Sequence, residues 1–279
     1  MSFLYLDLQN PVQHGLQKLL NSHPQIHCSG ESLINRLYKH IEIASTSFNN
    51  EIDDINNIRL QSKSNYIKIT KENLDIFFKD LVYKSQIDLI NSDKKNLVKY
   101  LGDKGPEYLH NFMFFKRLYP NAKYLHIIRD GRDALVSGWN QNIRLYGENY
   151  YENFKNFDNY FKHYASEWSS EIKKGRTFSS INEGSYFELK YEDLLSNSKH
   201  ILTDLLNFLG LDSSSRLVND CIEKNSFNVL SKGRKKGEED KSSFFRKGIK
   251  GEWRNYFDSD LNEFCKNEIG DILEKLGYE

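Results

Sequence analysis

Residues 119–137 read YPNAKYLHIIRDGRDALVS, and this stretch indicates the fold class. Its continuous apolar run, residues 124–128, predicts a strand buried on both faces of a parallel sheet. The strand ends at Arg129, where the sequence turns to Arg-Asp-Gly-Arg-Asp and a helix is expected to begin. Because ligands of open α/β sheets bind at the carboxyl ends of strands, Arg129 is placed to meet one there. Ser137, two helical turns further on, can face the same anion, and a guanidinium plus a hydroxyl suits a phosphate.

The same residues allow a second interpretation, in which Arg129 pairs with a neighbouring aspartate and closes the strand end. The first interpretation predicts a ligand pocket at this edge of the sheet, and the second predicts only a stable turn. Residue types alone leave the two alternatives open.

Apolar runs elsewhere in the chain predict further strands at residues 3–8, 97–101 and 186–189. Helical periods separate these runs, and the alternation predicts a three-layer α/β/α fold around a central parallel sheet. We expect a single domain over residues 1–279. An aromatic stripe at helical spacing in residues 154–172 is predicted to pack in the core.

Two segments depart from this alternation. Residues 45–95 are polar and weakly patterned, which predicts a variable insertion built of helices and loops. Residues 226–250 are rich in Gly and Lys and poor in apolar side chains, which predicts a mobile loop.

The composition indicates a folded, neutral protein, with 38% hydrophobic residues and 39 basic against 39 acidic residues. This balance argues against a nucleic-acid or membrane-surface partner. Three scattered cysteines are too few for a disulfide framework or a zinc site, and we expect no metal. The N-terminal residues do not read as a signal peptide, and no apolar stretch approaches the ~20 residues of a membrane span. These features predict a soluble cytoplasmic protein.

The stretch from residue 102 to residue 137 resembles the sulfotransferases that use PAPS (3′-phosphoadenosine 5′-phosphosulfate), and is especially similar to their tyrosylprotein and bacterial members. The resemblance rests on a Lys-x-Pro, an amphipathic helix and YPNAKYLHIIRDGRDALVS, in that order. It implies the sulfotransferase fold, which is like that of the P-loop NTPases. It also implies that Arg129 and Ser137 bind the 3′-phosphate of the nucleotide, and that Lys104 lies near the transferring sulfuryl group.

Two downstream segments agree in order and spacing. YFELKYEDLLSNSKHILTDLLNFLGL, residues 186–211, resembles a strand, turn and helix of the family and implies that Tyr191 lies near the adenine. FFRKGIKGEWRNYF, residues 244–257, resembles the loop that wraps the 3′-phosphate. The residues that this loop implies as ligands are Arg246, Lys247 and Gly248. Alone, the first segment is typical of a strand-to-helix turn and the second of a solvated basic loop.

The N-terminal segment departs from the family. Asn10-Pro11-Val12-Gln13-His14 stands where the family has Arg-Ser-Gly-Thr-Thr, a loop whose amides and cation hold the 5′-phosphosulfate. The cation, the glycine and both threonines are missing, and Pro11 lacks an N–H. Gln13 and His14 are the candidate substitute donors.

Residues 23–31, HPQIHCSGE, are similar to the stretch that carries the general base of tyrosylprotein-type members, which implies that role for Glu31. Burial of the carboxylate would suit the task. The alternative is that Glu31 is an N-terminal residue of the next helix. His110 is expected to be a surface residue.

The resemblance implies an enzyme that transfers the sulfuryl group of PAPS to a hydroxyl or amine of a small-molecule or sugar acceptor, as in natural-product tailoring. Adenosine 3′,5′-bisphosphate (PAP) would be the product, and the insertion at residues 45–95 would shape the acceptor pocket. The alternative, drawn from the altered residues 10–14, is a relative that binds PAP as a binding or interaction module. A P-loop kinase is excluded because the sequence has no Gly-x-x-x-x-Gly-Lys-Ser/Thr. A homodimer is left open.

Overall fold

The computed structural model describes residues 2–7, 12–60, 66–105 and 108–278 of the 279-residue chain. Side chains are described within these ranges except at residues 2–14, 59–60 and 148–149. In the described part, no helix is both long enough and apolar enough to cross a membrane.

A five-stranded sheet lies at the centre of the described chain, with the strand order β2-β3-β1-β4-β5 and every neighbouring pair parallel. The strands are β1 (Ser2–Asp7), β2 (Ile26–Cys28), β3 (Tyr100–Lys104), β4 (Lys123–Ile128) and β5 (Tyr186–Lys190). The register aligns Leu6 of β1 with Lys104 on one side and with Leu125 on the other. Parallel neighbours need crossover connections, which helices supply here. The predicted parallel α/β sheet is confirmed.

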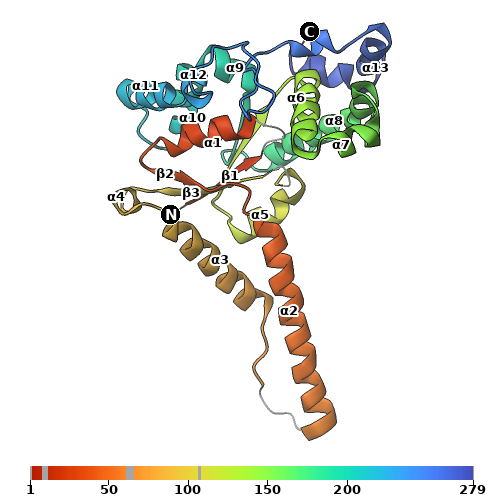
Figure 1. Cartoon of the computed structure of the whole chain (residues 1–279). Helices are drawn as coiled ribbons and strands as arrows, with labels where there is room; N and C mark the ends of the chain where they lie inside the picture. The colour runs from red at the N-terminus through yellow and green to blue at the C-terminus, as the bar shows by residue number, and fades with distance from the viewer. Residues whose placement is uncertain (1, 8–11, 61–65, 106–107, 279) are drawn as a thin grey trace.

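Helices cover both faces of this sheet (Figure 1). Those of the first half are α1 (Val12–Asn21), α2 (Ile34–Asp54), α3 (Lys71–Asp88), α4 (Ser92–Lys95), α5 (Phe112–Leu118) and α6 (Gly131–Tyr146). Those of the second half are α7 (Glu148–Phe154), α8 (Phe157–Ile181), α9 (Tyr191–Ser196), α10 (Ser198–Phe208), α11 (Ser215–Lys224), α12 (Phe227–Leu230) and α13 (Ser259–Lys275). The 3₁₀ turns η2 (Leu109–Asn111) and η3 (Glu252–Asn255) and the π-helical turn η1 (Ile55–Leu60) complete the set.

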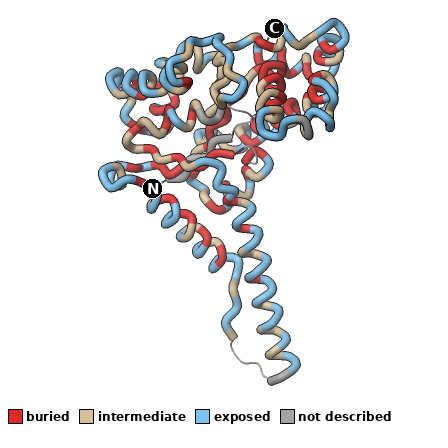
Figure 2. The backbone as a smooth tube through the Cα atoms, viewed as in Figure 1, coloured by how far each residue is buried: buried red, intermediate tan, exposed pale blue. Residues whose placement is uncertain are grey.

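Side chains of β4 show how the three layers form. Leu125 and Ile127 pack on one face of the sheet with apolar residues of α1, α10 and α11. Tyr124 points to the other face, among residues of α2, α3 and α5, because successive strand side chains alternate. Ile128 joins α6, α8 and α13, where the predicted aromatic stripe of residues 154–172 packs in the core. Buried backbone therefore runs through the centre of the molecule and along the inner sides of its helices (Figure 2).

One strand prediction needs correction, and one strand was missed. The strand expected at residues 97–101 begins and ends three residues later, at Tyr100–Lys104. Its last two residues are charged, yet both are buried, so a search for apolar runs ends too early. β2 was not predicted, because its three residues are too short to form a recognisable pattern.

The predicted insertion at residues 45–95 consists largely of the outer part of α2 and all of α3. These two helices form a hairpin that projects away from the sheet (Figure 1). At its base, the rings of Tyr38 and Phe78 pack edge to face with centroids 5.0 Å apart. The base of the hairpin belongs to the core, while most of the insertion extends away from the sheet instead of lying over its edge.

Candidate functional site

The candidate residues follow the carboxyl ends of neighbouring strands. Glu31 comes three residues after β2, and Lys104 is the last residue of β3. Arg129 follows β4, and Tyr191 follows β5. In a parallel sheet these ends share one edge. Lys104 and Arg129 follow strands with β1 between them, and the register places Arg129 four residues beyond the level of Lys104. This edge is where α/β proteins bind ligands.

Glu31 and Lys104 meet at this edge. The Lys104 Nζ lies 2.8 Å from the Glu31 Oε1. The side chain of Lys104 is 1% exposed and that of Glu31 is 54% exposed. A buried ammonium requires a partner, and Glu31 supplies one from the solvent side. The carboxylate of Glu31 therefore lacks the burial that would suit a general base, because the loop after β2 holds Glu31 at the rim of the site.

Glu31 does not lie in the helix that follows it, which was the alternative interpretation. α2 begins at Ile34, three residues after Glu31, and its N-cap residue is Leu33. Leu33 has a left-handed conformation with φ of 48° and makes no side-chain cap. Glu31 thus belongs to a turn between β2 and α2, where its side chain is available to the Lys104 side of the edge.

Asp103, which the sequence analysis missed, fixes the loop that carries Glu31. Its side chain is fully buried and accepts hydrogen bonds from the Ser29 Oγ (3.2 Å), the Ser32 Oγ (3.0 Å) and the Ser32 backbone N–H (3.3 Å). The hydroxyl of Tyr108 donates to the same carboxylate. Burial raises the pKa of Asp103, although these hydrogen bonds oppose the shift. The only signal in the sequence was a charged residue directly before Lys104.

The resemblance implied several nucleotide-binding residues, and all of those that follow α1 in the sequence line one pocket. These residues are Arg129, Ser137, Tyr191, Arg246, Lys247 and Gly248. Gly15 lines the same pocket, so the first turn of α1 borders it as well. Segments more than a hundred residues apart in the sequence therefore converge on one concave surface.

Arg129 extends from the end of β4 into this pocket. Its guanidinium lies over the ring of Tyr191, 5.0 Å from the centroid. Its Nη2 donates to the backbone carbonyl of Ile249 over 3.4 Å. Its Nε is buried and has no hydrogen-bond partner among the described residues. Arg129 thus keeps donor capacity for a ligand.

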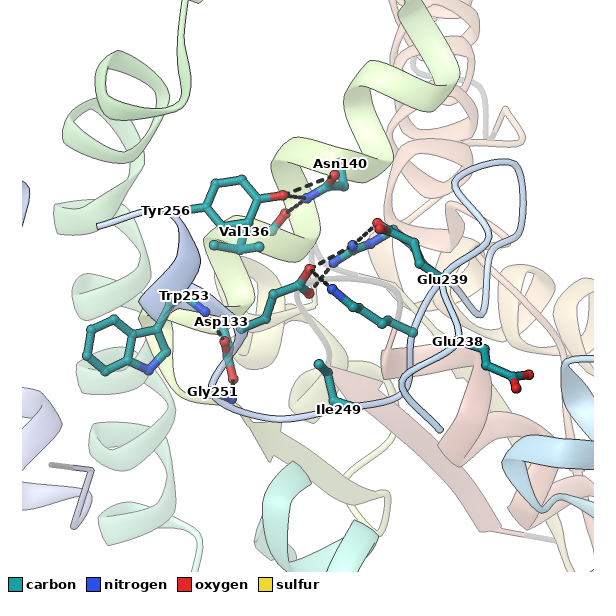
Figure 3. Close-up of polar contacts among 12 residues, drawn as sticks. Asp133, Val136, Asn140, Glu238, Glu239, Ile249, Gly251, Trp253 and Tyr256 are labelled. Atoms are coloured by element: carbon teal, nitrogen blue, oxygen red, sulfur yellow. Dashed lines mark hydrogen bonds and ion pairs between the residues drawn. The ribbon is translucent and has the colours of Figure 1, made fainter. Parts of the chain in front are cut away.

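The aspartates near Arg129 bind other groups. Asp130 accepts two hydrogen bonds from the guanidinium of Arg132, at 2.9 and 2.7 Å. Asp133 accepts from the backbone N–H groups of Gly251 and Trp253, which ties the C-terminal loop to α6 (Figure 3). This arrangement favours the ligand interpretation of Arg129 over the ion pair that closes a strand end.

Arg246 and Lys247 are held by carboxylates within the protein. Arg246 pairs with Glu239 and, through two bonds, with Glu252; the Lys247 Nζ lies 3.2 Å from the Glu252 Oε1. Glu252 is 5% exposed. Burial works to raise the pKa of Glu252, but the hydrogen bonds and charges of Arg246 and Lys247 outweigh it and lower that pKa. Glu252 therefore acts as a permanent counter-ion that orients both cations.

Gly248 explains why a glycine follows these cations. Its φ is +66°, a conformation that other residues adopt only with strain. A Cβ at this position would lie 2.5 Å from the ring of Phe227. Both facts require a glycine where the backbone passes close to Phe227 at the pocket.

Further pocket residues lie on the same helix as Ser137. Asn140, Gln141 and Arg144 follow it at spacings of three, four and seven residues, which is one face of α6. Lys241 lines the pocket from the C-terminal loop. Their helical spacing from Ser137 was the signal by which Asn140, Gln141 and Arg144 could have been predicted from the sequence. The lining thus contains five cations, Arg129, Arg144, Lys241, Arg246 and Lys247, and one carboxylate, Glu252.

A second, mostly apolar pocket of about 240 Å³ adjoins the first. The two share Tyr191, Phe227 and Gly248, and the second extends between α1, α9 and the residues around α12. Burial raises the pKa of Tyr191, which keeps its hydroxyl protonated. The combined surface has a cationic part and an apolar part, and Tyr191 lies between them.

Other predicted features have mixed outcomes. Gln13 and His14 lie in the first turn of α1, but their side chains and residues 8–11 are outside what the structure describes. His110 is exposed, as predicted, and also bonds Glu171 at 3.0 Å. The segment 226–250, expected to be a mobile loop, contains α12 and many internal bonds. Arg234 makes three of these bonds, because its guanidinium donates to backbone carbonyls of that segment over 2.6 to 3.0 Å.

These features define an α/β protein of P-loop-like fold with a cationic pocket at the carboxyl edge of its sheet. The chain belongs to the sulfotransferase family, whose family model matches residues 15–215. It is 23% identical over 178 residues to human sulfotransferase 2A1, a match covering 56% of this chain. It is 24% identical over 204 residues to a putative protein-tyrosine sulfotransferase of Caenorhabditis elegans, covering 73% of this chain and 68% of that protein. The part of this chain that matches human 2A1 and three other sulfotransferases spans only 52–59% of the length of those proteins.

Solved structures show the same fold. Mouse sulfotransferase SULT7A1 complexed with PAP superposes with a TM-score of 0.60 at 14% identity, covering 97% of this chain and 82% of the mouse chain. Retinol dehydratase in complex with androsterone and PAP gives 0.54 at 17% identity, covering 98% and 80%. At these identities the likeness concerns the fold alone.

Proposed function

We propose that this protein transfers the sulfuryl group of PAPS to a hydroxyl or amine of a small-molecule or sugar acceptor. The observation that carries the proposal is the convergence of six implied nucleotide ligands on one pocket, at the same sheet edge as the Glu31–Lys104 pair. PAPS supplies a sulfuryl group that is already activated by its phosphate. The tasks left to the protein are positioning, charge stabilisation and removal of a proton.

The residues of the cationic pocket fit the 3′-phosphate of the donor. The guanidinium of Arg129 lies at the pocket over the ring of Tyr191, and Ser137 lines the same pocket from α6. Arg246 and Lys247 are already oriented by Glu252, so binding an anion costs little reorganisation. Five cations against one carboxylate leave the pocket attractive to a doubly charged phosphate.

The neighbouring apolar pocket fits the adenine. Its lining of leucines, Ile222 and Phe227 excludes water from a flat heterocycle, and Tyr191 offers a ring to it. Gly15 borders both pockets, so the first turn of α1 would face the 5′ side of the nucleotide. Helix N-termini favour anions through their free N–H groups, and this can offset part of the missing family loop.

Glu31 and Lys104 would divide the chemistry between them. As the acceptor oxygen or nitrogen bonds sulfur, the bond from sulfur to the bridging oxygen breaks and the acceptor loses a proton to Glu31. Lys104 would donate to the oxygen that gains negative charge. The exposed position of Glu31 suits a base that must meet an incoming acceptor, while the buried Lys104 suits an electrostatic role.

A groove beside Glu31 gives the acceptor a route to the pair. It is lined by Glu31, Lys104 and Tyr108, and it also includes Asn35 and Arg36 at the start of α2. Asn35 and Arg36 are shared with a wider groove between α2 and α5, where Tyr38 and Phe114 contribute aromatic surface. Aromatic faces with polar groups around them suit a sugar or a flat small molecule.

Thermal unfolding with PAP, with PAPS and without ligand tests this proposal. A ligand that binds only the folded state adds about 2.7 kcal/mol at a hundredfold excess over its Kd. We expect stabilisation by both nucleotides, and release of PAP from PAPS when an acceptor library is added. Stabilisation by PAP alone, without turnover, supports the alternative binding module. Absence of stabilisation by either nucleotide at millimolar concentration overturns the nucleotide site.

A further inference from the structure

Behind Arg129 lies a small cavity that the proposed reaction does not use. Its volume is about 20 Å³, and its lining includes Arg129, Trp168 and Glu171 together with apolar residues of β4 and α8. A single water needs roughly 10–15 Å³ on the same measure, together with at least two polar partners. The cavity therefore has room for one water.

Two polar atoms of the residues that line this cavity have no hydrogen-bond partner among the described residues. One is the Nε of Arg129, and the other is the Oε2 of Glu171. Both atoms are buried. Buried polar atoms without a hydrogen bond cost about 1–3 kcal/mol each, and they are rare in folded proteins. A donor and an acceptor that face the same water-sized space can satisfy each other through one water.

The other oxygen of Glu171 is already engaged. Its Oε1 lies 3.0 Å from the Nε2 of His110, and the Lys174 Nζ lies 3.1 Å from the Nδ1 of His110. An ammonium only donates, so Nδ1 accepts and Nε2 carries the proton toward Glu171. Burial and Lys174 lower the pKa of His110, which agrees with a neutral ring. The hydrogen bonds from Lys174 through His110 to Glu171 fix the carboxyl group, and they leave its Oε2 for other partners.

α8 is held firmly against the strand end that carries Arg129. A Cβ on Gly131, two residues after Arg129, would lie 2.7 Å from the ring of Trp168. Trp168 is 3% exposed and lies one helical turn before Glu171, which is also 3% exposed. Such close packing keeps the cavity, Arg129 and Glu171 in a fixed relation.

We propose that Glu171 is a positioning residue for Arg129, acting through one buried water that accepts from the Arg129 Nε–H and bonds the Glu171 Oε2. This inference rests on the proposed nucleotide site. The bond holds the guanidinium edge-on to the cavity, so that its outer nitrogens face the pocket and the 3′-phosphate. Burial, followed by the charge of Glu167, raises the pKa of Glu171 to about 8, and either protonation state of the carboxyl can bond a water.

The test measures recognition of the 3′-phosphate directly. Calorimetric titration at pH 7 gives the Kd for PAP and for adenosine 5′-phosphate, which lacks the 3′-phosphate, and the ratio of the two reports Arg129. We expect Glu171→Leu to reduce that ratio about fivefold to tenfold, and Glu171→Gln to retain most of it, because the amide can bond the water. Glu167→Leu, an exposed carboxylate one turn earlier, is the matched control and should leave the ratio unchanged.

A double-mutant cycle separates positioning from a general structural role. In an Arg129→Met background, Glu171→Leu should no longer change the ratio, because the guanidinium it orients is absent. Equal weakening of both nucleotides by Glu171→Leu, or an undiminished effect without Arg129, overturns the inference. A wild-type protein that binds both nucleotides equally overturns the proposed nucleotide site itself, and the inference with it.

Discussion

The Lys104 ammonium and the Glu31 carboxylate lie 2.8 Å apart, one almost fully buried and the other half exposed. They come from two adjacent strand ends, more than seventy residues apart in the sequence. Lys104 is 1% exposed, and both it and Glu31 line the groove beside them. In the proposed reaction, Lys104 would therefore be the buried electrostatic group, and Glu31 would be the base that an acceptor can reach from solvent.

Glu31→Gln should separate catalysis from nucleotide binding, and Lys104→Met should affect both. We expect transfer to fall about 10²–10⁴-fold without the base. Loss of one preorganised donor should lower it about 10²–10³-fold. The Kd for PAP should change less than about threefold in Glu31→Gln, because Glu31 does not line the cationic pocket. Lys104→Met should also weaken PAP, because the oxygen to which Lys104 would donate stays on the 5′-phosphate of PAP. Single-turnover kinetics with PAPS and calorimetry with PAP make the comparison; unchanged transfer in Glu31→Gln would falsify its role as base.

Asp103 should matter for activity through Glu31. Asp103→Ala removes the acceptor for Ser29, Ser32 and Tyr108, so we expect a loss of about 1–3 kcal/mol in the free energy of unfolding and a lower kcat. Asp103→Asn keeps an acceptor oxygen and should retain more of both. Tyr108→Phe removes one donor but leaves the serine bonds, and is the matched control. Urea unfolding and turnover on the same samples test this; full activity in Asp103→Ala would show that the loop holds Glu31 unaided.

The sequence predicted this site best where it concerns strand ends. Arg129 was identifiable because a parallel sheet brings carboxyl ends to one edge, whereas Tyr191 and Lys104 were implied by the resemblance to the sulfotransferases. Asp103 and Glu171 were not identifiable, since nothing in their local pattern shows that tertiary packing buries them. β3 was misplaced for the same reason, because its buried charges resemble the end of a strand.

The C-terminal loop shows a second limit of sequence reasoning. Local composition around Arg246 indicated a mobile basic loop. In the structure, Arg246 pairs with two carboxylates, and the guanidinium of Arg234 donates to backbone carbonyls of the same loop. Those contacts depend on where the chain returns, and residue spacing does not encode that. By contrast, the face of α6 that carries Ser137 and Asn140 follows from helical spacing alone once the helix is assigned.

The two carboxylates around Arg246 should have opposite effects on nucleotide binding. Glu239 is a partly exposed loop residue whose carboxylate competes with a phosphate for Arg246, so Glu239→Gln should tighten PAP binding about twofold to fivefold. Glu252 is buried and orients both Arg246 and Lys247, so Glu252→Gln should weaken PAP binding. Glu238→Gln makes the same charge change beside Glu239, and the Glu238 carboxylate accepts from the backbone N–H of Lys235 at 2.9 Å. Calorimetry at two salt concentrations tests this. If the Glu238 and Glu239 variants changed the Kd for PAP equally, the effect would come from net charge and not from competition for Arg246.

The raised pKa of Glu171 predicts a pH dependence of stability. Its pKa is about 8 in the folded protein, mainly because of burial, while an unfolded glutamate titrates near 4.3. Between these values the unfolded state loses the proton first, so this group lowers the free energy of unfolding as pH rises from about 4.5 to 8. Glu171→Gln has no such proton, so it should gain stability relative to wild type across that window and keep the gain above it. Urea unfolding at pH 5, 7 and 9 measures the difference, and a constant difference would contradict it.

Gly248→Ala should disturb the pocket through the backbone. The new Cβ would lie 2.5 Å from Phe227, whose ring is shared by both pockets, and the residue would keep a φ of +66°. Gly184→Ala is the matched control, because Gly184 has a φ of +77° with no atom within 4 Å of the added Cβ. Both variants should lose about 1 kcal/mol of stability from the left-handed conformation. Only Gly248→Ala should also weaken PAP, by about tenfold or more, since Phe227 or the loop must move. Equal PAP affinity in the two variants would show that the pocket accommodates this displacement and that Gly248 serves the turn alone.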